Sequence, residues 1–334
     1  MSAAEVREPA PNDVELLEKA RESSRTLRTA IAVRVVGQED VIELMLVALL
    51  ARGHALLVGV PGLAKTLLVA SLAQALDLSF GRVQFTPDLL PADITGTDVL
   101  QDDAGGRVVR FLPGPIFHNL VLADEINRTP PKTQAALLQA MQERRVTVGM
   151  NTHALPDPFQ VFATRNPIEQ EGTYPLPEAQ LDRFLLEVHV EYPSAVEEKE
   201  IARRTTGASE GDIPRVLNSN EVRALQGLVP RMPVTDAAIE LAVALGRTTR
   251  PHDPRAPREV KELVRFGAGP RGSQALVLAS KARAALRGEA AADVDDVRAL
   301  VTPVLRHRLV LSYRAEAEGV RDVDVLERVI AAVG

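Results

Sequence analysis

The sequence contains no cysteine and no tryptophan, and aromatic residues make up only 3% of its 334 residues. Without cysteine, the chain cannot form disulfide bonds, thiolate metal sites or a cysteine nucleophile. Its core must therefore be built from leucine, valine, isoleucine and alanine. The six histidines are far apart in the sequence, which argues against a metal site made of histidine alone.

The sequence also has no excess of basic residues and no long apolar run. Its net charge of −6 argues against broad binding to nucleic acid or to an anionic membrane, although it leaves room for a local basic patch. No apolar stretch approaches the ~20 residues that span a bilayer, so we expect no membrane insertion. The polar N-terminus does not have the pattern of a signal peptide, and we therefore expect a cytoplasmic protein.

What the sequence does contain is a glycine-rich segment, residues 59–66, between an apolar run at 55–58 and a helix-like stretch at 65–76. A strand, such a turn and a helix start form a phosphate cradle, because backbone N–H groups converge in the turn and the helix N-terminus adds partial positive charge. Lys65 can reach the β- and γ-phosphates of ATP, and the Thr66 hydroxyl can bind Mg²⁺. The residues expected to hold the nucleotide here are Gly59, Pro61, Gly62, Leu63, Ala64, Lys65, Thr66 and Leu67.

One position departs from the phosphate-loop pattern G-x-x-x-x-G-K-[ST]. Ala64 stands where the second glycine is expected. Alanine adds only a methyl group, so a tight loop accepts it where the backbone angles allow. The alternative interpretation of the segment is a chance glycine turn before a helix.

Two acids follow an apolar strand at residues 119–123. Ligands of open α/β sheets bind at the carboxyl ends of the strands, where Asp124 and Glu125 would lie. We expect Asp124 to hold Mg²⁺ through water and Glu125 to polarise a water for attack on the γ-phosphate. The alternative is a strand that ends in a solvated acidic turn.

A third strand, around residues 161–164, ends near Asn166. The amide of Asn166 could orient the attacking water. An asparagine before a proline is also a routine turn starter, so both interpretations stay open at this point.

The pattern of the chain predicts an α/β domain followed by a helical one. Strands are predicted at 54–58, 82–85, 119–123, 159–164 and 184–190, and their continuous apolar character favours a parallel five-stranded sheet that is buried on both faces. After residue 193 the strand signal fades, and helices are predicted at 197–206, 219–228, 235–247, 273–286 and 294–305. We therefore assign residues 1–12 to a loose tail, 13–193 to the nucleotide-binding domain and 194–334 to the helical domain.

Three further helices are predicted in the first domain, at 13–32, at 40–52 and after Thr129. Asp40 and Thr129 are expected to cap the second and third of them. The inward face of the third would hold Ala135, Leu138 and Met141.

Taken together, these segments resemble the MoxR family of AAA+ ATPases, over about residues 36–311. The segments that carry the resemblance are 59–66, 85–94, 124–128 and 166–184, and the last of them is long enough to be specific. The family commonly has alanine at the position of Ala64. The resemblance implies an AAA+ fold with a helical lid, ATP hydrolysis with Mg²⁺, and a homo-oligomeric ring, in this family a hexamer.

The resemblance also implies roles for residues whose own patterns are weak. Val36, Gly37 and Gln38 match the segment that packs near the adenine, and Asn166 matches the first sensor residue. Arg183 matches the arginine finger, which enters the neighbouring subunit's site, and Arg271 matches the second sensor, which lies against the γ-phosphate. The family usually has serine where Gly269 stands. Without the resemblance, a surface salt bridge is the simpler interpretation of each arginine.

Two inserts bear on what the ATPase would act on. Residues 85–102 match an insert after the second strand, and residues 145–155 read as a hairpin with Gly149 and Asn151 in its turn. In related AAA+ proteins such inserts line the ring pore or meet the substrate. The plainer alternative is an exposed hairpin that only covers a sheet edge.

Three functions remain open from the sequence. The first is a chaperone-like ATPase that remodels or matures a client protein, which the family suggests could carry a von Willebrand factor A domain. The second is a nucleic-acid or chelatase-type motor of the same clade, against which the acidic net charge and the few aromatic residues count. The third is a scaffold that binds ATP but barely hydrolyses it, against which Glu125, Asn166 and Arg183 argue.

Overall fold

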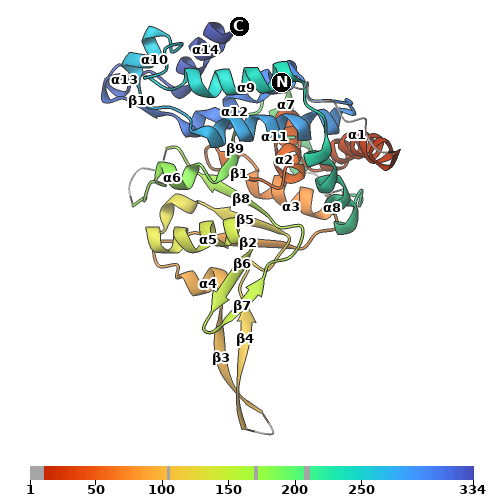
Figure 1. The fold of residues 1–334 in the computed structure, drawn as a ribbon. Coiled ribbons are helices and arrows are strands. Elements are labelled where there is room, and N and C mark those ends of the chain that lie inside the picture. The colour runs from red at the N-terminus through yellow and green to blue at the C-terminus, as the bar shows by residue number, and fades with distance from the viewer. Residues whose placement is uncertain (1–10, 104–105, 169–171, 207–210) are drawn as a thin grey trace.

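The computed structural model describes residues 11–103, 106–168, 172–206 and 211–334. Figure 1 shows a central sheet with helices, a layer of helices above it and two hairpins that project below it. The predicted tail falls mostly on residues 1–10, which lie outside the described residues, as do residues 169–171 of the family motif. At 11–12 the tail prediction is wrong, because helix α1 (Pro11–Ile31) already begins at Pro11.

The central sheet confirms the predicted fold class. Its five parallel strands lie in the order β2-β5-β8-β1-β9. Every residue of β1 and β5 is buried, which explains their continuous apolar sequences. Because all five strands run the same way, the segments that follow β1, β5 and β8 meet at one edge. The strands are β1 (His54–Val58), β2 (Phe80–Gln84), β5 (Leu120–Asp124), β8 (Gln160–Arg165) and β9 (Phe184–His189).

The helices of the first domain form close to their predicted positions, but their caps differ. Helix α2 begins one residue before Asp40, and its N-cap is Gln38, so Asp40 lies in the first turn. Thr129 does not cap α5, because Pro130 is the N-cap and has no capping side chain. The helices are α2 (Glu39–Leu50), α3 (Lys65–Ala75), α4 (Pro91–Thr95), η1 (Ile126–Arg128), α5 (Pro131–Glu143) and α6 (Glu178–Leu181).

The inward face of α5 is also partly different from the prediction. Leu138 and Met141 are buried as expected, whereas Ala135 is exposed. The buried face also includes Thr133, Gln134, Leu137 and Ala140, so it is turned about the helix axis from the one predicted.

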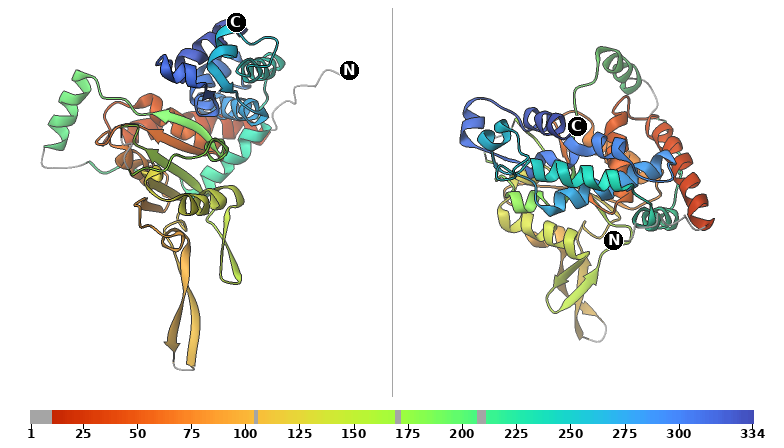
Figure 2. Two further views of the ribbon diagram at one scale, coloured as in Figure 1. Left: turned by 90° about the vertical axis from the view of Figure 1, so that its left-hand side faces the viewer. Right: turned by 45° about the horizontal axis from the view of Figure 1, so that its top comes forward.

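The second part of the chain is a helical lid, as predicted, with one short antiparallel strand pair, β10–β11, that the sequence analysis missed. It also contains α10, α13 and α14, which were not predicted. Figure 2 shows that α7 stands away from the rest of the molecule, and its described residues include no buried one. The elements are α7 (Ala195–Thr205), α8 (Ser219–Leu228), η2 (Val229–Arg231), α9 (Asp236–Thr248), α10 (Arg258–Leu263), β10 (Val264–Phe266), α11 (Pro270–Arg287), α12 (Val294–Leu305), η3 (Arg306–Arg308), β11 (Val310–Leu311), α13 (Tyr313–Ala317) and α14 (Asp322–Val333).

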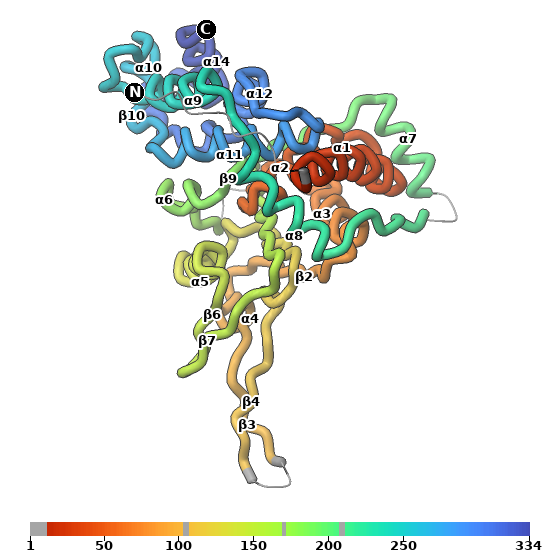
Figure 3. The backbone as a smooth tube through the Cα atoms, turned by 45° about the vertical axis from the view of Figure 1, so that its right-hand side comes forward, coloured from red at the N-terminus to blue at the C-terminus, as the bar shows by residue number. Residues whose placement is uncertain are grey.

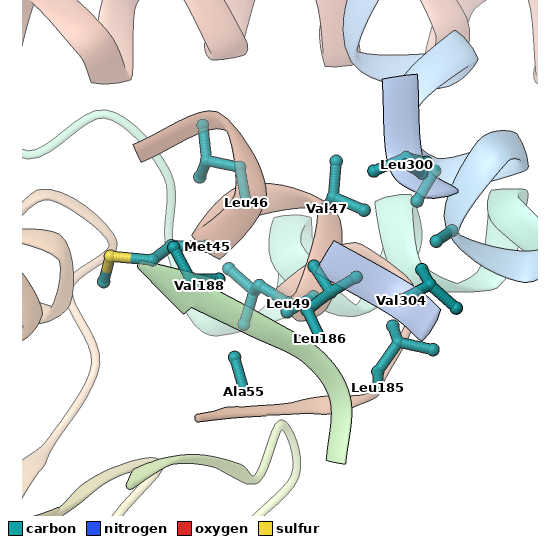
Figure 4. Packing of buried hydrophobic residues seen from close by; sticks show 14 of the residues in the cluster. Met45, Leu46, Val47, Leu49, Ala55, Leu185, Leu186, Val188, Leu300 and Val304 are labelled. Carbon is teal, nitrogen blue, oxygen red and sulfur yellow. The ribbon is translucent and has the colours of Figure 1, made fainter. Parts of the chain in front are cut away.

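The lid and the sheet share one hydrophobic core. Figure 4 shows Met45 and Leu49 of α2 beside Leu186 of β9, with Leu300 and Val304 of α12 on the other side. All five side chains are almost completely buried. Strand β9 is the edge of the sheet, so α12 and η3 cover an edge that would otherwise expose unpaired backbone groups.

Two hairpins project from the side of the sheet that is opposite the lid (Figures 1 and 3). The first, β3 (Gly96–Asp103) with β4 (Gly106–Pro113), shows that the insert predicted at 85–102 continues to Pro113. The second, β6 (Arg145–Val148) with β7 (Asn151–Ala154), confirms the predicted hairpin. Asn151 is not in its turn, however, because it pairs with Val148. Phe111 of the first hairpin stacks on His153 of the second, with ring centroids 3.9 Å apart, so the hairpins support each other.

Candidate functional site

The glycine-rich segment forms a loop at the carboxyl end of β1, as the sequence predicted. A cavity of about 490 Å³ lies against it. Gly62 has a φ of 87°, which is the left-handed region that favours glycine. Gly59 is needed for a different reason, since a Cβ there would lie 2.7 Å from the backbone oxygen of Val190. The cavity is lined by Pro61, Gly62, Leu63, Ala64, Lys65, Thr66, Leu67, Arg82, Asp124, Glu125, Thr164 and Asn166.

Ala64 also adopts a left-handed conformation, with φ 55° and ψ 22°, as the N-cap of α3. The loop therefore accepts alanine, but at a position where glycine would be less strained. A non-glycine residue in this conformation costs about 1–2 kcal/mol. Such local strain is common where a loop is held in shape for a ligand.

Lys65 begins α3 and bends back over the loop. Its Nζ donates to the backbone oxygens of Gly59 at 2.6 Å and of Val60 at 2.7 Å. Burial lowers the pKa of Lys65, while the charges of Asp124 and Glu125 act in the opposite direction. The ammonium group therefore faces the two acids across the cavity and already lies at the loop.

Asp124 ends β5 and is held by two neighbouring strands. Its Oδ1 accepts from the Thr164 hydroxyl of β8 at 2.6 Å, and its Oδ2 accepts from Arg82 of β2 at 2.7 Å. Thr164 also accepts from the backbone N–H of Glu125 at 2.8 Å. One buried hydroxyl thus fixes both acids relative to each other.

Glu125 lies at a strained backbone position, with φ 58° and ψ 50°. Its Oε2 accepts from Gln84 at 2.7 Å and from Arg128 at 2.9 Å. The side chain is therefore restrained by polar partners beside the cavity.

Asn166 fits both interpretations that the sequence left open. It lines the cavity, and its Oδ1 also accepts from the backbone N–H of Ile168 at 3.2 Å, as in a turn that an asparagine starts. The turn fixes the side chain at the end of β8, next to the two acids of β5.

A second cavity, of about 600 Å³, lies beside the end of β9. The predicted residues Val36, Gly37 and Gln38 line it. Val58, the last residue of β1, pairs with His189, which lines the same cavity, so this cavity adjoins the start of the phosphate loop. The other lining residues are Glu39, Asp40, Val41, His189, Glu191, Tyr192, Pro193 and Glu197.

Arg183 and Arg271 do not line either of these cavities. Both line a separate hollow of about 220 Å³, together with His54, Met141, Gln142 and Asp182. Arg271 pairs with Asp182 at 3.5 Å, and its side chain is 64% exposed. The structure thus brings the two arginines to each other and not to the phosphate loop of their own chain.

The lid holds this region through three consecutive residues of η3, which we call the clamp (Arg306, His307 and Arg308). Arg308 donates to Asp182 at 2.9 Å and to the backbone oxygens of Phe184 at 2.8 Å and Leu185 at 3.2 Å. His307 lies 3.1 Å from the Phe184 oxygen. Burial, and then the charge of Arg308, holds the pKa of His307 well below its usual value.

The third clamp residue reaches the other end of β9. Arg306 pairs with Glu187 at 3.4 Å and with Asp322 at 3.1 Å. Glu187 also contacts His189, at 2.8 Å, and Arg165, at 3.5 Å. The clamp therefore connects the lid to Asp182, the residue beside Arg183. Through Glu187 it also connects the lid to His189, which lines the second cavity.

Several of these residues were missed by sequence analysis. Arg82 and Gln84 alternate on β2 and so point to the same face beside the acids, but nothing local in the sequence shows that β2 pairs with β5. Thr164 lies on β8 two residues before Asn166, which follows the strand, and this spacing is the signal that could have indicated it.

The residues of the first cavity fit a magnesium nucleotide. Mg²⁺ is usually bound by one or two protein oxygens together with phosphate oxygens and water, so it does not need a cluster of protein ligands. Thr66 and Asp124 supply such oxygens in one cavity with Lys65. Among the described residues, no group of three or more histidine, cysteine or acidic side chains could hold a metal by itself.

Among the described residues, no helix has the length and apolar character to cross a bilayer. Comparison with known proteins gives matches over nearly the whole chain. Residues 54–186 match the model of the ATPase family associated with various cellular activities (AAA), and residues 257–329 match the AAA lid domain. The chain is 42% identical to the chaperone MoxR1 of Mycobacterium tuberculosis over 99% of its own length and 87% of that protein.

Two further relatives agree with these matches. The chain is 34% identical to the protein MoxR of Paracoccus denitrificans, over 86% of this chain and 88% of that one. A crystal structure from Cytophaga hutchinsonii superimposes with a TM-score of 0.89 at 37% identity, covering 96% of this chain and 97% of that one. Sequence and structure therefore point to the same set of relatives.

Proposed function

The chain belongs to the MoxR family of AAA ATPases and hydrolyses ATP as that family does, and from this premise we propose that its subunits complete one another's active sites in a ring that remodels or matures a client protein. The observation that carries the proposal is the position of Arg183 and Arg271. Both lie in a hollow of their own, outside the cavity that their own phosphate loop lines.

Within one subunit, the first cavity binds the triphosphate and prepares the attacking water. The loop N–H groups and Lys65 bind the phosphates, and Glu125 accepts a proton from the water that Asn166 orients. Thr66 and Asp124 would hold Mg²⁺, which supplies neutralisation of phosphate charge when it is bound. The second cavity, with Val36, Gly37 and Gln38, is of a size and place to receive the adenosine part.

The guanidinium that lines the first cavity, that of Arg82, is paired with Asp124, so we infer that a further arginine reaches the γ-phosphate from outside the subunit. Negative charge spreads over the γ-phosphoryl oxygens in the transition state, and an arginine supplied there is worth about 10³–10⁵ in rate. Arg271 is exposed and Arg183 is partly exposed, and Asp182 holds Arg271 beside Arg183. We infer that both arginines serve the site of the adjoining subunit, so that assembly switches the ATPase on.

The hairpins and the division of the chain fit the same proposal. The two hairpins project together from the side opposite the lid, where they could contact a client (Figure 1). A client with a von Willebrand factor A domain and a ring of six subunits are what the resemblance implies. We keep the proposed boundary near residue 194, between β9 and α7, although the core continues across it.

A complementation experiment tests the proposed contribution of the neighbouring subunit. Glu125→Gln should bind ATP and lose turnover, and Arg183→Ala should also bind ATP and lose most turnover. A mixture of the two variants should regain activity, because an intact Glu125 site then adjoins an intact Arg183. Arg203→Ala, which removes an exposed arginine of α7, serves as the matched control and should keep wild-type turnover.

The outcome distinguishes the two arrangements of the arginine. If Arg183 served its own chain, mixing would give only the sum of two inactive proteins. For the client, Glu125→Gln should retain a protein in the presence of ATP and release it with ADP. Stimulation of turnover by DNA, with no retained protein, would instead favour the nucleic-acid motor.

A further inference from the structure

The lid carries a basic hollow that has no part in the proposed ATP site. It has a volume of about 420 Å³ and lies between the end of α9 and strand β10. We call it the lid hollow. It is lined by Arg247, Arg250, Pro251, His252, Asp253, Pro254, Arg265, Phe266 and Gly267.

The walls of the lid hollow are fixed by hydrogen bonds within the lid. Asp253 is buried, and it accepts from Arg247 at 2.9 Å and from the backbone N–H of Arg255 at 3.0 Å. Arg250 donates through Nε to the Ala268 oxygen at 2.9 Å, and Thr249 accepts from the Ala268 N–H at 2.9 Å. The proline-rich loop is therefore tied to the segment that follows β10, and the hollow is a built feature of the lid.

Positive charge in the lid hollow exceeds negative charge. Its one carboxylate, Asp253, is matched by Arg247. Within the described residues, neither Arg250 nor Arg265 pairs with a carboxylate, and Arg265 instead lies over the Phe266 ring, 5.3 Å from its centroid. In a chain with a net charge of −6, this is a local concentration of unmatched cations.

An aromatic surface lies next to these charges. Phe266 is 58% exposed, which is unusual for a phenylalanine in a chain with only eight of them. A ring beside two guanidinium groups offers both apolar contact and charge, a combination that is enriched where proteins recognise partners.

The position of the lid hollow separates it from the proposed client-binding hairpins. Figure 1 shows β10 at the opposite end of the molecule from β3 and β4. The wall formed by Gly267 leads within a few residues to α11, whose first turn carries Arg271. A ligand in the hollow would thus rest against the segment that positions Arg271.

We propose that the lid hollow binds an acidic peptide segment of a partner protein, with an apolar side chain of that segment on Phe266. Carboxylates of the segment pair with Arg250 and Arg265, whose charges the chain itself leaves unmatched. A nucleic acid is the less suitable ligand, because a backbone of phosphates needs an extended basic groove with several stacking residues, whereas this hollow has a volume of about 420 Å³ and offers only Phe266 and His252 among its lining residues.

The test uses the full-length protein and a defined probe. The probe is a fluorescent peptide in which glutamates flank one phenylalanine, and its control has glutamine in place of glutamate. The variant Arg250→Gln/Arg265→Gln removes the unmatched charges and also the hydrogen bond of Arg250 to the Ala268 oxygen. The single variant Arg265→Gln, measured beside it, removes one of these charges and leaves that hydrogen bond in place. The matched control, Arg258→Gln/Arg314→Gln, removes the same charge from exposed lid arginines that pair with Glu262 outside the hollow.

We expect the acidic peptide to bind the wild type and the matched control equally and the hollow variant about tenfold more weakly, with binding that weakens as salt is added. Basal ATP turnover should be equal in all three, which shows that the variants fold. Phe266→Ala should weaken binding without changing its salt dependence. The proposal is overturned if the glutamine peptide binds as well as the acidic one, if neither peptide binds the wild type, or if the hollow variant binds as the wild type does.

Two further results would assign a different occupant and so also overturn the proposal. The first is that the wild type binds an oligothymidylate but not the peptide, and that the hollow variant no longer binds the oligothymidylate. The second is a change in oligomeric state of the hollow variant with unaltered peptide binding, which would show that the hollow receives a second copy of this chain.

Discussion

Replacement of Arg308 by leucine should destabilise the whole protein, although Arg308 is not part of the proposed active site. The side chain is only 4% exposed and is the residue of the clamp that joins the lid to the edge strand β9. Leucine fills part of the same volume and removes every hydrogen bond. The perturbation therefore isolates the polar contacts of the clamp.

The expected magnitude follows from those contacts. Removal of one partner of a buried ion pair costs about 3–5 kcal/mol, and the partial exposure of Asp182, at 29%, places this pair at the lower end. The Leu185 carbonyl also loses its Arg308 donor, at about 1–3 kcal/mol where it stays dry, and the Phe184 carbonyl loses one of its two partners, since His307 remains 3.1 Å from it. Because these losses overlap and water can enter, we expect a decrease of about 4 kcal/mol in the free energy of unfolding.

Thermal unfolding followed by circular dichroism, with nucleotide absent throughout, is the suitable assay. A loss of this size should lower the melting temperature by about 5–10 °C. Arg314→Leu is the matched control, since Arg314 is exposed and its ion pairs among the described residues are those with Glu262 and Glu318, which predicts a change of about 0–1 kcal/mol. If Arg308→Leu melted within 2 °C of that control, roughly the shift of 1 kcal/mol, the clamp would not be a main source of lid stability.

Three other changes test separate parts of the structure. Thr164→Val keeps the shape of a buried residue and removes the hydroxyl that joins Asp124 to Glu125. It should lower the turnover number by at least about tenfold and the free energy of unfolding by about 1–3 kcal/mol. Unchanged kinetics would show that the hydroxyl does not position the acids. Ala64→Gly should relieve the left-handed strain and raise stability by up to about 1 kcal/mol with ATP affinity retained, whereas Ala64→Val should lower both, as calorimetry and thermal melts can show. Burial lowers the pKa of His54 to about 4, so between about pH 6.5 and 4 the unfolded chain binds a proton that the folded chain does not. The free energy of unfolding should therefore fall as the pH is lowered through that window. His54→Gln should flatten this fall in acid denaturation curves, and an unaltered slope would contradict the assignment.

The sequence predicted the parts of the fold and site that depend on local patterns. Strands β1 and β5 are apolar runs because both faces of the sheet are covered there, and the phosphate loop is a contiguous motif. The edge strand β2 differs from the prediction, because its buried and exposed residues alternate. The MoxR motif identified the two arginines in the sequence, but it did not predict where they lie in the structure. Their placement depends on how the lid packs on β9, and Asp182 and Arg308, which decide it, are 126 residues apart.

The parts of the fold that were missed have separate physical causes. The hairpin β3–β4 has apolar side chains on exposed positions, such as Leu100 and Val109, so it shows no clear division into a buried and a solvated face. Helix α13 has five residues, too few to show a helical period. Asp40 and Thr129 are good capping residues that are out of register by a residue or two, which is the usual uncertainty of helix ends.

The shared core between lid and sheet has a mechanical consequence. Helix α2 and helix α12 both pack on β9, and the clamp fastens the same strand, so within the described residues an apolar junction joins the lid to the sheet. A tightly packed apolar junction of this kind resists shear and rotation. Each copy would consequently travel as a single block during the ATP cycle, and the displacement that does mechanical work would occur at the seams between copies.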